Sequence, residues 1–306
     1  MMAPAAKLPF LGTLRVHSVL YGNEANRIDQ AIEHLERAAD FAIAAGVFKE
    51  VALVYGDCSP TPALSETVKA HARSGSALHE VDYRYFDENL GSARGHNRLL
   101  EDLAEDYVLI MNPDIMMAPN TLLELAKPFA NTKVGMVEAK QIPIEHPKEY
   151  VAGTGETCWA ATACTLIPAQ VFAEIGGFDY QTFFLYCDDV DFSWRVRLAG
   201  LKVIYQASAL AFHDKRLGGQ GKWVPGGAEK YYSAEAALLL AYKYHRDDIV
   251  RDVLKYFLGS GEETLLAAAA EFQARREEGR LPEQIDPSHK VAVFKDGAYS
   301  AHRFVL

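Results

Sequence analysis

The sequence "KEVALVYGD", residues 49–57, decides the fold class of this chain. Its apolar and aromatic run at residues 51–55 is followed by Gly56 and Asp57, a pattern typical of a strand buried inside a parallel sheet. The preceding residues, 24–46, repeat apolar side chains at helical spacing and end on a glycine, and another apolar segment lies before them. A strand, a helix and a second strand in this order predict a βαβ unit.

The alternation of strands and helices continues along the chain. Segments with the character of strands lie at residues 14–22, 49–57, 78–87, 107–114, 134–143 and 203–212. Helical patterns lie at residues 24–46, 63–75, 88–106 (after an initial loop), 119–131 and within 164–179. The rhythm changes after residue 114, where we expect the sheet to become mixed. The predicted fold class is therefore α/β, with a mixed, mainly parallel sheet flanked by helices and with ligands at the carboxyl ends of its strands.

Composition limits the classes of function. The 306 residues are 49% hydrophobic and 24% charged, and the net charge of −10 gives no broad basic surface for nucleic acid. No stretch reaches the roughly 18 apolar residues of a membrane span, and the first 22 residues lack the apolar region of a secretory signal, so we expect a cytoplasmic protein. The four cysteines form no CxxC pair, which fits a reducing compartment and disfavours a zinc site.

A glycine-rich stretch divides the chain. Five glycines fall within residues 213–227, a composition suited to a flexible loop, which is interpreted either as a lid over a ligand or as a plain connector. We therefore expect a nucleotide-binding and catalytic domain at residues 1–215. Residues 216–306 are expected to hold this loop and a C-terminal helical extension, whose helices are candidates for acceptor binding, homodimer formation or peripheral membrane contact.

Polar residues follow the predicted strands. Asp57 can accept hydrogen bonds from a nucleotide base or ribose, or can cap its own turn, and Tyr21 and Asn23 follow the first strand. Asp114 ends "MNPD" and is either a ligand for a hard cation on a diphosphate or part of a turn. His213 is either a further metal ligand or a structural histidine.

Two further motifs carry candidate chemistry. In "ENLGSARGHN", residues 88–97, Arg94 can pair with a phosphate, although neither a Walker motif nor a dinucleotide glycine triad is present. In "FFLYCDDVDFSWR", residues 183–195, an apolar run interpreted as a strand leads into three aspartates. Asp191 and Arg195 are four residues apart and can pair on one helix face. The adjacent carboxylates Asp188 and Asp189 suit either the start of a helix or a general base with a raised pKa.

The order of these motifs resembles the family 2 inverting glycosyltransferases, which have the GT-A fold. The resemblance covers roughly residues 14–215 and rests on "ENLGSARGHN", "MNPD", "IGGFD" and "YCDDVDFSWRVRLAGLKVIY". The Asn-Pro-Asp form of the metal motif is most similar to the rhamnosyltransferase-like branch. Thr162 stands where that family often has glycine, and only the last residue of the metal motif is acidic.

The resemblance implies a role for each matching residue. Asp189 would be the catalytic base, with Asp188 as the second candidate, and Asp114 and His213 would hold Mg²⁺ or Mn²⁺. Asp191 would contact the substrates or support Arg195. Contacts with the nucleotide-diphosphate sugar, expected to be a dTDP- or UDP-sugar, are implied for Tyr21, Asn23, Asp57, Asn89, Gly91, Arg94 and Asn112.

The function that we expect is transfer of a sugar to a hydroxyl of a glycan or lipid-linked saccharide, as in the synthesis of surface polysaccharides. Contact with the inner face of a membrane would then be at most peripheral. Two alternatives remain open: a nucleotidyltransferase, and a catalytically silent sugar-nucleotide-binding or scaffold protein.

Overall fold

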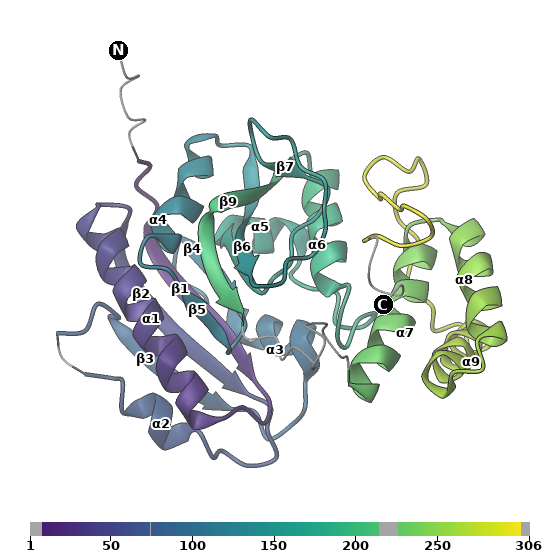
Figure 1. Ribbon diagram of the computed structural model, residues 1–306, viewed down its shortest axis with the longest axis horizontal. Helices are drawn as coiled ribbons and strands as arrows, with labels where there is room; N and C mark the ends of the chain where they lie inside the picture. Colours follow the sequence, from purple (N-terminus) through teal and green to yellow (C-terminus); the bar gives the residue numbers. More distant parts are fainter. Residues whose placement is uncertain (1–7, 74, 214–225, 301–306) are drawn as a thin grey trace.

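The stretch that predicts the fold class forms the strand β2 (Phe48–Asp57), in which every residue from Val51 onward is buried. The computed structural model describes residues 8–73, 75–213 and 226–300. β2 pairs in parallel with β1 (Gly12–Leu20) on one side and with β3 (Glu80–Tyr85) on the other. β1 in turn pairs in parallel with β4 (Tyr107–Met111), so the predicted parallel half of the sheet is confirmed (Figure 1).

The sheet becomes mixed after β4, as predicted. β8 (Cys164–Pro168) runs antiparallel to β4, and β6 (Val134–Ile142) runs antiparallel to β8. The order of strands in the described sheet is β3-β2-β1-β4-β8-β6-β9-β5, and the short β7 also pairs with β9. The remaining bounds are β5 (Ile115–Met117), β7 (Glu156–Thr157) and β9 (Lys202–His213).

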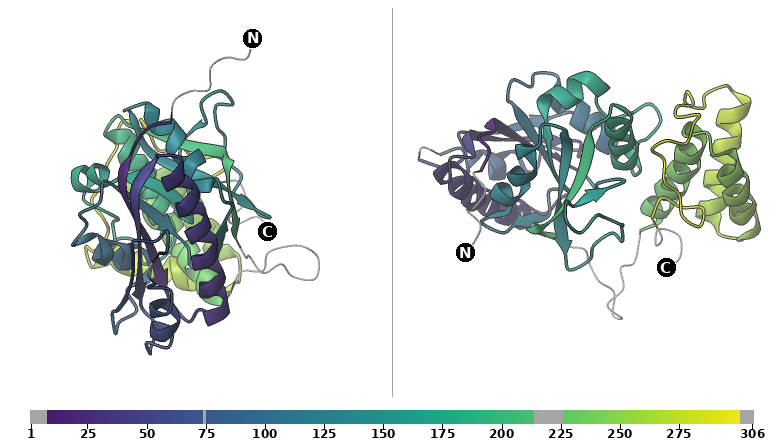
Figure 2. Two further views of the ribbon diagram at one scale, coloured as in Figure 1. Left: turned by 90° about the vertical axis from the view of Figure 1, so that its left-hand side faces the viewer. Right: turned by 90° about the horizontal axis from the view of Figure 1, so that it is seen from above.

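Helices cover both faces of the sheet because its inner strands are apolar on both sides (Figure 2). In β4, Leu109 and Met111 belong to one hydrophobic core, whereas Val108 and Ile110 belong to another. This is the alternation of side chains expected along a strand. The helices of the sheet region are α1 (Ala25–Ala44), α2 (Ser65–Lys69), α3 (Gly91–Leu100), α4 (Thr121–Ala126), followed by a 3₁₀ turn (Lys127–Ala130), α5 (Ala169–Ile175) and α6 (Asp188–Leu198).

The predicted C-terminal helical extension consists of α7 (Gly227–Lys243), α8 (Asp247–Gly259) and α9 (Glu263–Glu277). It lies beside α6 rather than over the sheet (Figure 1). A third hydrophobic core joins Leu239, Phe257 and Phe272 of these helices to Trp194 of α6 and to Phe183 of the preceding loop. The extension therefore stabilises the part of the chain that carries the acidic motif. Most of the glycine-rich stretch, residues 214–225, lies outside the described residues.

Two predictions of secondary structure were wrong. The apolar run at residues 183–186 is a loop, not a strand, because Phe183 turns into the third core and Tyr186 and Cys187 have φ angles of 64° and 57°. The helix predicted at 63–75 is much shorter, since Val68 is the one buried side chain of α2 and little packing favours further turns. No helix within the described ranges is long and apolar enough to cross a membrane.

Candidate functional site

Asp57 lies at the carboxyl edge of the sheet, opposite Leu20 of β1 and Tyr85 of β3. The residue is completely buried. Its carboxylate accepts a hydrogen bond from the backbone N–H of Ser59 at 2.8 Å and another from the hydroxyl of Tyr83. Burial and the neighbouring carboxylate raise the pKa of Tyr83. Asp57 therefore does cap its own turn, and Tyr83, which the sequence motifs do not single out, is its second partner.

The loop after β1 lies against the turn that follows Asp57. The backbone N–H of Tyr21 donates to the side-chain oxygen of Asn23 at 2.9 Å, and that of Gly22 donates to Ser59 Oγ at the same distance. The side chain of Tyr21 is 57% exposed. This arrangement leaves an aromatic ring free to stack at the edge of the sheet, next to Asp57.

The turn before α3 is in close contact with the loop that leads to the acidic motif. Asn89 Oδ1 accepts the backbone N–H of Gly91 at 3.2 Å, and Gly91 has a φ of 66°. A Cβ at Gly91 would lie 2.4 Å from the carbonyl oxygen of Phe184, and the N–H of Ser92 donates to that oxygen at 3.1 Å. Only glycine allows this approach. Arg94 forms an exposed ion pair with Glu88 at 2.7 Å.

The predicted metal motif and the late histidine meet at neighbouring strand ends. In the antiparallel pair of β5 and β9, Ile115 lies opposite His213. This register places Asp114 Oδ1 3.4 Å from His213 Nε2, and Asn112 Nδ2 is 3.5 Å from the same nitrogen. His213 Nδ1 lies 2.7 Å from the side-chain oxygen of the buried Gln141 at the end of β6. Gln141 is absent from the predicted site, although its place at a strand end was a usable signal.

This arrangement fits a divalent cation on a diphosphate. In the tautomer whose Nδ1 donates to the Gln141 oxygen, Nε2 keeps its lone pair and can act as a metal ligand beside Asp114. One carboxylate and one imidazole are enough protein ligands for such a cation when phosphate oxygens and water complete its coordination shell. Among the described residues, no group of three or more histidine, cysteine or acidic side chains gathers to hold a metal alone. The amide nitrogen of Gln141 is also buried without a partner in the described structure.

Asp188 and Asp189 occupy the first turn of α6, where the helix dipole favours negative charge. Asp188 is 4% exposed, and burial together with the charge of Asp189 raises its pKa to about 7. Its Oδ2 atom has no hydrogen-bond partner among the described residues. Asp189 is partly exposed, and its Oδ1 accepts the backbone N–H of Val190 at 2.8 Å. Asp189 is thus the more accessible carboxylate of the two.

Asp191 is the centre of a buried ionic network. Arg195 Nε lies 2.8 Å from Asp191 Oδ2, which confirms the predicted pair. On the other side, Lys243 Nζ lies 2.6 Å from Asp191 Oδ1, and the hydroxyl of Tyr244 donates to this oxygen at 3.1 Å. Asp191 is completely buried. Because its carboxylate contacts both Arg195 and Lys243, it links α6 to the end of α7.

The glycine loop before the acidic motif is held from α3. Asn97 exchanges two hydrogen bonds with the backbone of Phe178, at 2.8 and 2.9 Å. A Cβ at Gly177 would lie 2.7 Å from Asn97 Oδ1, and Arg195 donates to the carbonyl of Gly177 at 2.8 Å. These contacts fix the "GGFD" loop between α3 and α6. Thus the motifs that are separate in the sequence form one connected structure.

The aromatic side chain of Trp159 is buried and so is not available to stack on a sugar. Its ring lies beneath the ammonium of Lys148 at 4.1 Å and in edge contact with Tyr299 at 5.2 Å. Lys148 pairs with Glu138, whose pKa is raised to about 7 by burial. Thr162, the departure from the family pattern, is also buried. Trp159 therefore belongs to the core in this structure.

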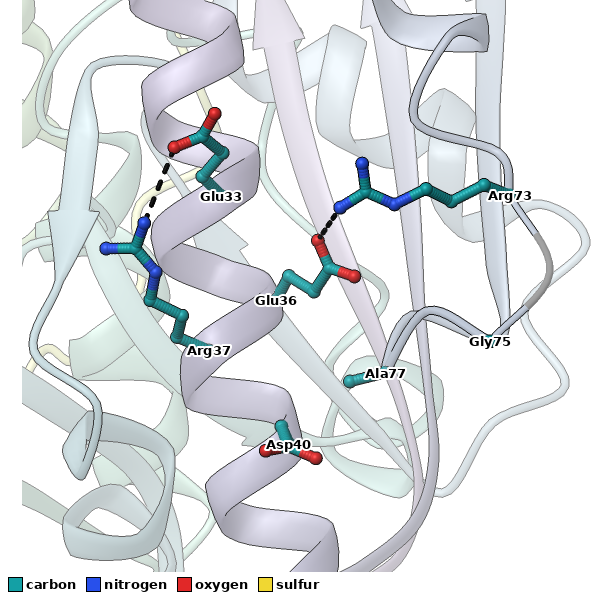
Figure 3. A pocket seen from close by; sticks show the side chains of 7 residues that line it. All are labelled: Glu33, Glu36, Arg37, Asp40, Arg73, Gly75 and Ala77. Atoms are coloured by element: carbon teal, nitrogen blue, oxygen red, sulfur yellow. Dashed lines mark hydrogen bonds and ion pairs between the residues drawn. The ribbon is translucent and has the colours of Figure 1, made fainter.

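A hollow of about 450 Å³ beside α1 offers no comparable chemistry. Figure 3 shows two of its acidic side chains paired, Glu33 with Arg37 and Glu36 with Arg73. The segment around Arg73 precedes β3, so the hollow lies toward the amino ends of the strands, away from Asp57. We therefore place the functional site at the carboxyl edge.

A solved glycosyltransferase structure shares the fold of this chain. A mannosyltransferase from Pyrobaculum calidifontis, solved with GDP-Man and Mn²⁺, matches with a TM-score of 0.59 and 17% identity over 86% of this chain and 75% of that one. This likeness shows the predicted GT-A glycosyltransferase fold.

Two proteins related by sequence are named as rhamnosyltransferases. Rhamnosyltransferase WbbL of Escherichia coli K12 is 29% identical over 146 residues, 37% of this chain and 55% of that protein. The N-acetylglucosaminyl-diphospho-decaprenol L-rhamnosyltransferase of Mycobacterium tuberculosis is 26% identical over 179 residues, 42% of this chain and 56% of that protein. The chain spans about half the length of these relatives. The family model described as glycosyl transferase family 2 matches residues 19–190, more than half of the chain, and the chain therefore belongs to glycosyl transferase family 2.

Proposed function

We propose that this chain is an inverting glycosyltransferase that moves a sugar from a nucleotide-diphosphate sugar to a hydroxyl of a glycan or lipid-linked saccharide. The observation that carries the proposal is the placement of Asp114 beside His213 Nε2, with Gln141 holding the other ring nitrogen. A carboxylate and an imidazole nitrogen suit a cation bound to a diphosphate, at the edge of the sheet where the family 2 motifs lie close together. When bound, Mg²⁺ or Mn²⁺ would neutralise charge on the departing nucleoside diphosphate.

The donor would lie along the carboxyl ends of β1, β2 and β4. Tyr21 would stack on the base, Asn23 would contact it, and Asp57 would set the floor of the base pocket together with Tyr83. Around the diphosphate, Asn112 would lie beside the cation site. The turn that holds Asn89 and Gly91, with Arg94 on the same helix start, would face the phosphates. We propose a dTDP- or UDP-sugar as the donor.

Asp189 would act as the base in a single displacement. Its carboxylate takes the proton of the acceptor hydroxyl while that oxygen forms a bond to the anomeric carbon of the sugar. The bond from that carbon to the diphosphate oxygen breaks at the same time, and the anomeric configuration inverts. Asp189 is preferred over Asp188 because it is partly exposed, whereas Asp188 is almost completely buried. Asp188 would instead support the base by hydrogen bonding with Ser92.

The acceptor is proposed from the relatives. The mycobacterial relative is named for a saccharide carried on decaprenyl diphosphate. A lipid-linked saccharide would fit a cytoplasmic enzyme in peripheral contact with the membrane.

Donor binding tests the proposal. Thermal unfolding of the whole chain is followed with UDP-, dTDP- and GDP-sugars, with and without Mn²⁺, because a ligand that binds the folded state alone raises the unfolding temperature. We expect one nucleotide class to stabilise the protein, more strongly with Mn²⁺. If no nucleotide changes the transition under either condition, the proposal is wrong.

A further inference from the structure

A polar pocket of about 390 Å³ lies where the acidic helix meets the C-terminal extension. One wall comes from the loop after the "GGFD" motif, with Asp179, Gln181 and Thr182, and another from Lys243 at the end of α7. The segment after α9 closes the pocket with Arg280, Leu281, Pro282, Glu283 and Ile285. None of these side chains has a role in donor binding or in the displacement described above.

The pocket presents a hydrogen-bond donor, the ammonium of Lys243, beside a hydrogen-bond acceptor, the carboxylate of Asp179, and both are held in place. Lys243 Nζ lies 2.8 Å from Asp179 Oδ2 and 2.6 Å from Asp191 Oδ1. An ammonium has three N–H groups; Asp179 and Asp191 engage two of those on Lys243, and the nitrogen also lies 5.6 Å from the centroid of the Phe183 ring. Asp179 also accepts from the backbone N–H of Thr182 at 3.2 Å and from the Thr182 hydroxyl, and its side chain is 23% exposed. Its carboxylate therefore keeps accepting capacity toward the pocket.

This pair matches two hydroxyl groups on adjacent carbons. One hydroxyl can donate to the carboxylate of Asp179 while its neighbour accepts from the ammonium of Lys243. Because Lys243 is 6% exposed and already held by two carboxylates, binding would cost little further side-chain entropy. The site is thus organised before any ligand arrives.

The other lining residues favour a neutral ligand with an apolar face. Leu281, Pro282 and Ile285 supply apolar surface suited to the C–H face of a sugar ring, and Glu283 adds a second carboxylate that could accept from a hydroxyl. The cations around the pocket are already paired, since Arg195 bonds Asp191 and Arg280 bonds Glu278. A phosphate would also meet the carboxylate of Asp179, so an anion is disfavoured.

We propose that this pocket binds a saccharide unit of the acceptor, a short distance from the unit that reacts. The inference rests on the proposed function, because it makes the C-terminal extension part of the acceptor site. Arg195, which lines the pocket, is six residues beyond Asp189 on α6, or about 9 Å along the helix axis. An acceptor that reaches from the pocket to Asp189 would therefore contain more than one sugar.

Blocking the pocket tests this inference without relying on turnover. The probes are methyl glucoside, methyl N-acetylglucosaminide and methyl rhamnoside at millimolar concentration, observed by saturation-transfer NMR on the full chain. Two variants place an indole in or over the pocket: Leu281→Trp on the apolar wall and Gln181→Trp at an exposed position. The control is Leu258→Trp, at a leucine that is 52% exposed on α8 and does not line the pocket.

We expect at least one glycoside to bind the unmodified chain and the control equally, and each pocket variant to weaken binding by about tenfold or more. Because Gln181 is exposed, its variant keeps the test valid if Leu281→Trp destabilises the fold. Failure of every glycoside to bind the unmodified chain would overturn the inference, and so would equal binding by folded pocket variants. Failure of every donor nucleotide to bind would instead refute the proposed function. The rise in unfolding temperature that a donor nucleotide causes is expected to be the same in both pocket variants as in the unmodified chain.

Discussion

Replacing Lys243 with methionine isolates the ionic network that joins the C-terminal extension to the acidic helix. Methionine keeps most of the apolar stem and removes the charge between Asp179 and Asp191. Asp191 is completely buried, and removal of one partner from such a pair costs about 3–5 kcal/mol. Because Arg195 still neutralises the other oxygen of Asp191, we expect the lower end, about 3 kcal/mol, which changes the ratio of folded to unfolded protein by about two powers of ten.

The assay is urea unfolding followed by tryptophan fluorescence, since Trp194 lies 4.7 Å from the ring of Tyr244 in the same network. Asp179→Asn should cost less, about 1 kcal/mol, because its side chain is 23% exposed and Lys243 keeps its bond to Asp191. Lys69→Met is the control, on a surface pair whose lysine is 61% exposed, and should leave the midpoint unchanged. A Lys243→Met protein as stable as the control would refute this reasoning.

Three further predictions concern single positions. Gly91→Ala should destabilise the chain by about 1–3 kcal/mol more than Gly46→Ala in chemical unfolding, because both have positive φ but only at Gly91 would a Cβ meet a backbone oxygen, at 2.4 Å. Gln141→Leu should weaken Mn²⁺ binding in the presence of nucleoside diphosphate by about 10–100-fold in calorimetry, since the ring of His213, a proposed metal ligand, loses its partner. His96→Phe should become more stable relative to the unmodified chain as the pH falls from 6.5 toward 4. Burial lowers the pKa of His96 to about 4 in the folded state, so in this window the unfolded chain binds the extra proton.

Each of these predictions has an outcome that contradicts it. Equal stability of the Gly91→Ala and Gly46→Ala proteins would mean that the turn before α3 can move away from the acidic loop. Gln170→Leu, a change on the exposed surface of α5, is the control for Gln141→Leu, and equal Mn²⁺ affinity of both would remove Gln141 from the site. A stability difference between His96→Phe and the unmodified chain that does not vary with pH would show that His96 is protonated equally in both states.

Features of the site that depend on local sequence were predictable. Asp57 ends β2, and Asp114 lies in the turn just after β4, because an apolar run precedes each of them and periodicity locates such runs. Asp191 and Arg195 pair because a spacing of four residues places them on one face of a helix. The prediction of a strand at residues 183–186 is wrong because periodicity does not tell whether a neighbouring strand is present to pair with the apolar run.

Contacts between distant segments were not predictable in this way. Gln141 meets His213 because β6 and β9 are neighbours in the sheet, and no local pattern encodes that order. Lys243 reaches Asp191 only because α7 packs against α6 through the third core. The sequence-based boundary between residues 215 and 216 follows the glycine composition, whereas the third core combines side chains from both sides of it.

Asp189 is proposed to be the base of the sugar transfer, and this role is tested most directly by the release of nucleoside diphosphate from the donor in the presence of a lipid-linked saccharide acceptor. The unmodified chain is compared with Asp189→Asn and with the control Asp252→Asn, whose aspartate is 74% exposed on α8. We predict that Asp189→Asn keeps the donor-induced rise in unfolding temperature and loses about 10²–10⁴-fold in turnover, while the control behaves as the unmodified chain. Turnover by Asp189→Asn at the rate of the unmodified chain would contradict the account.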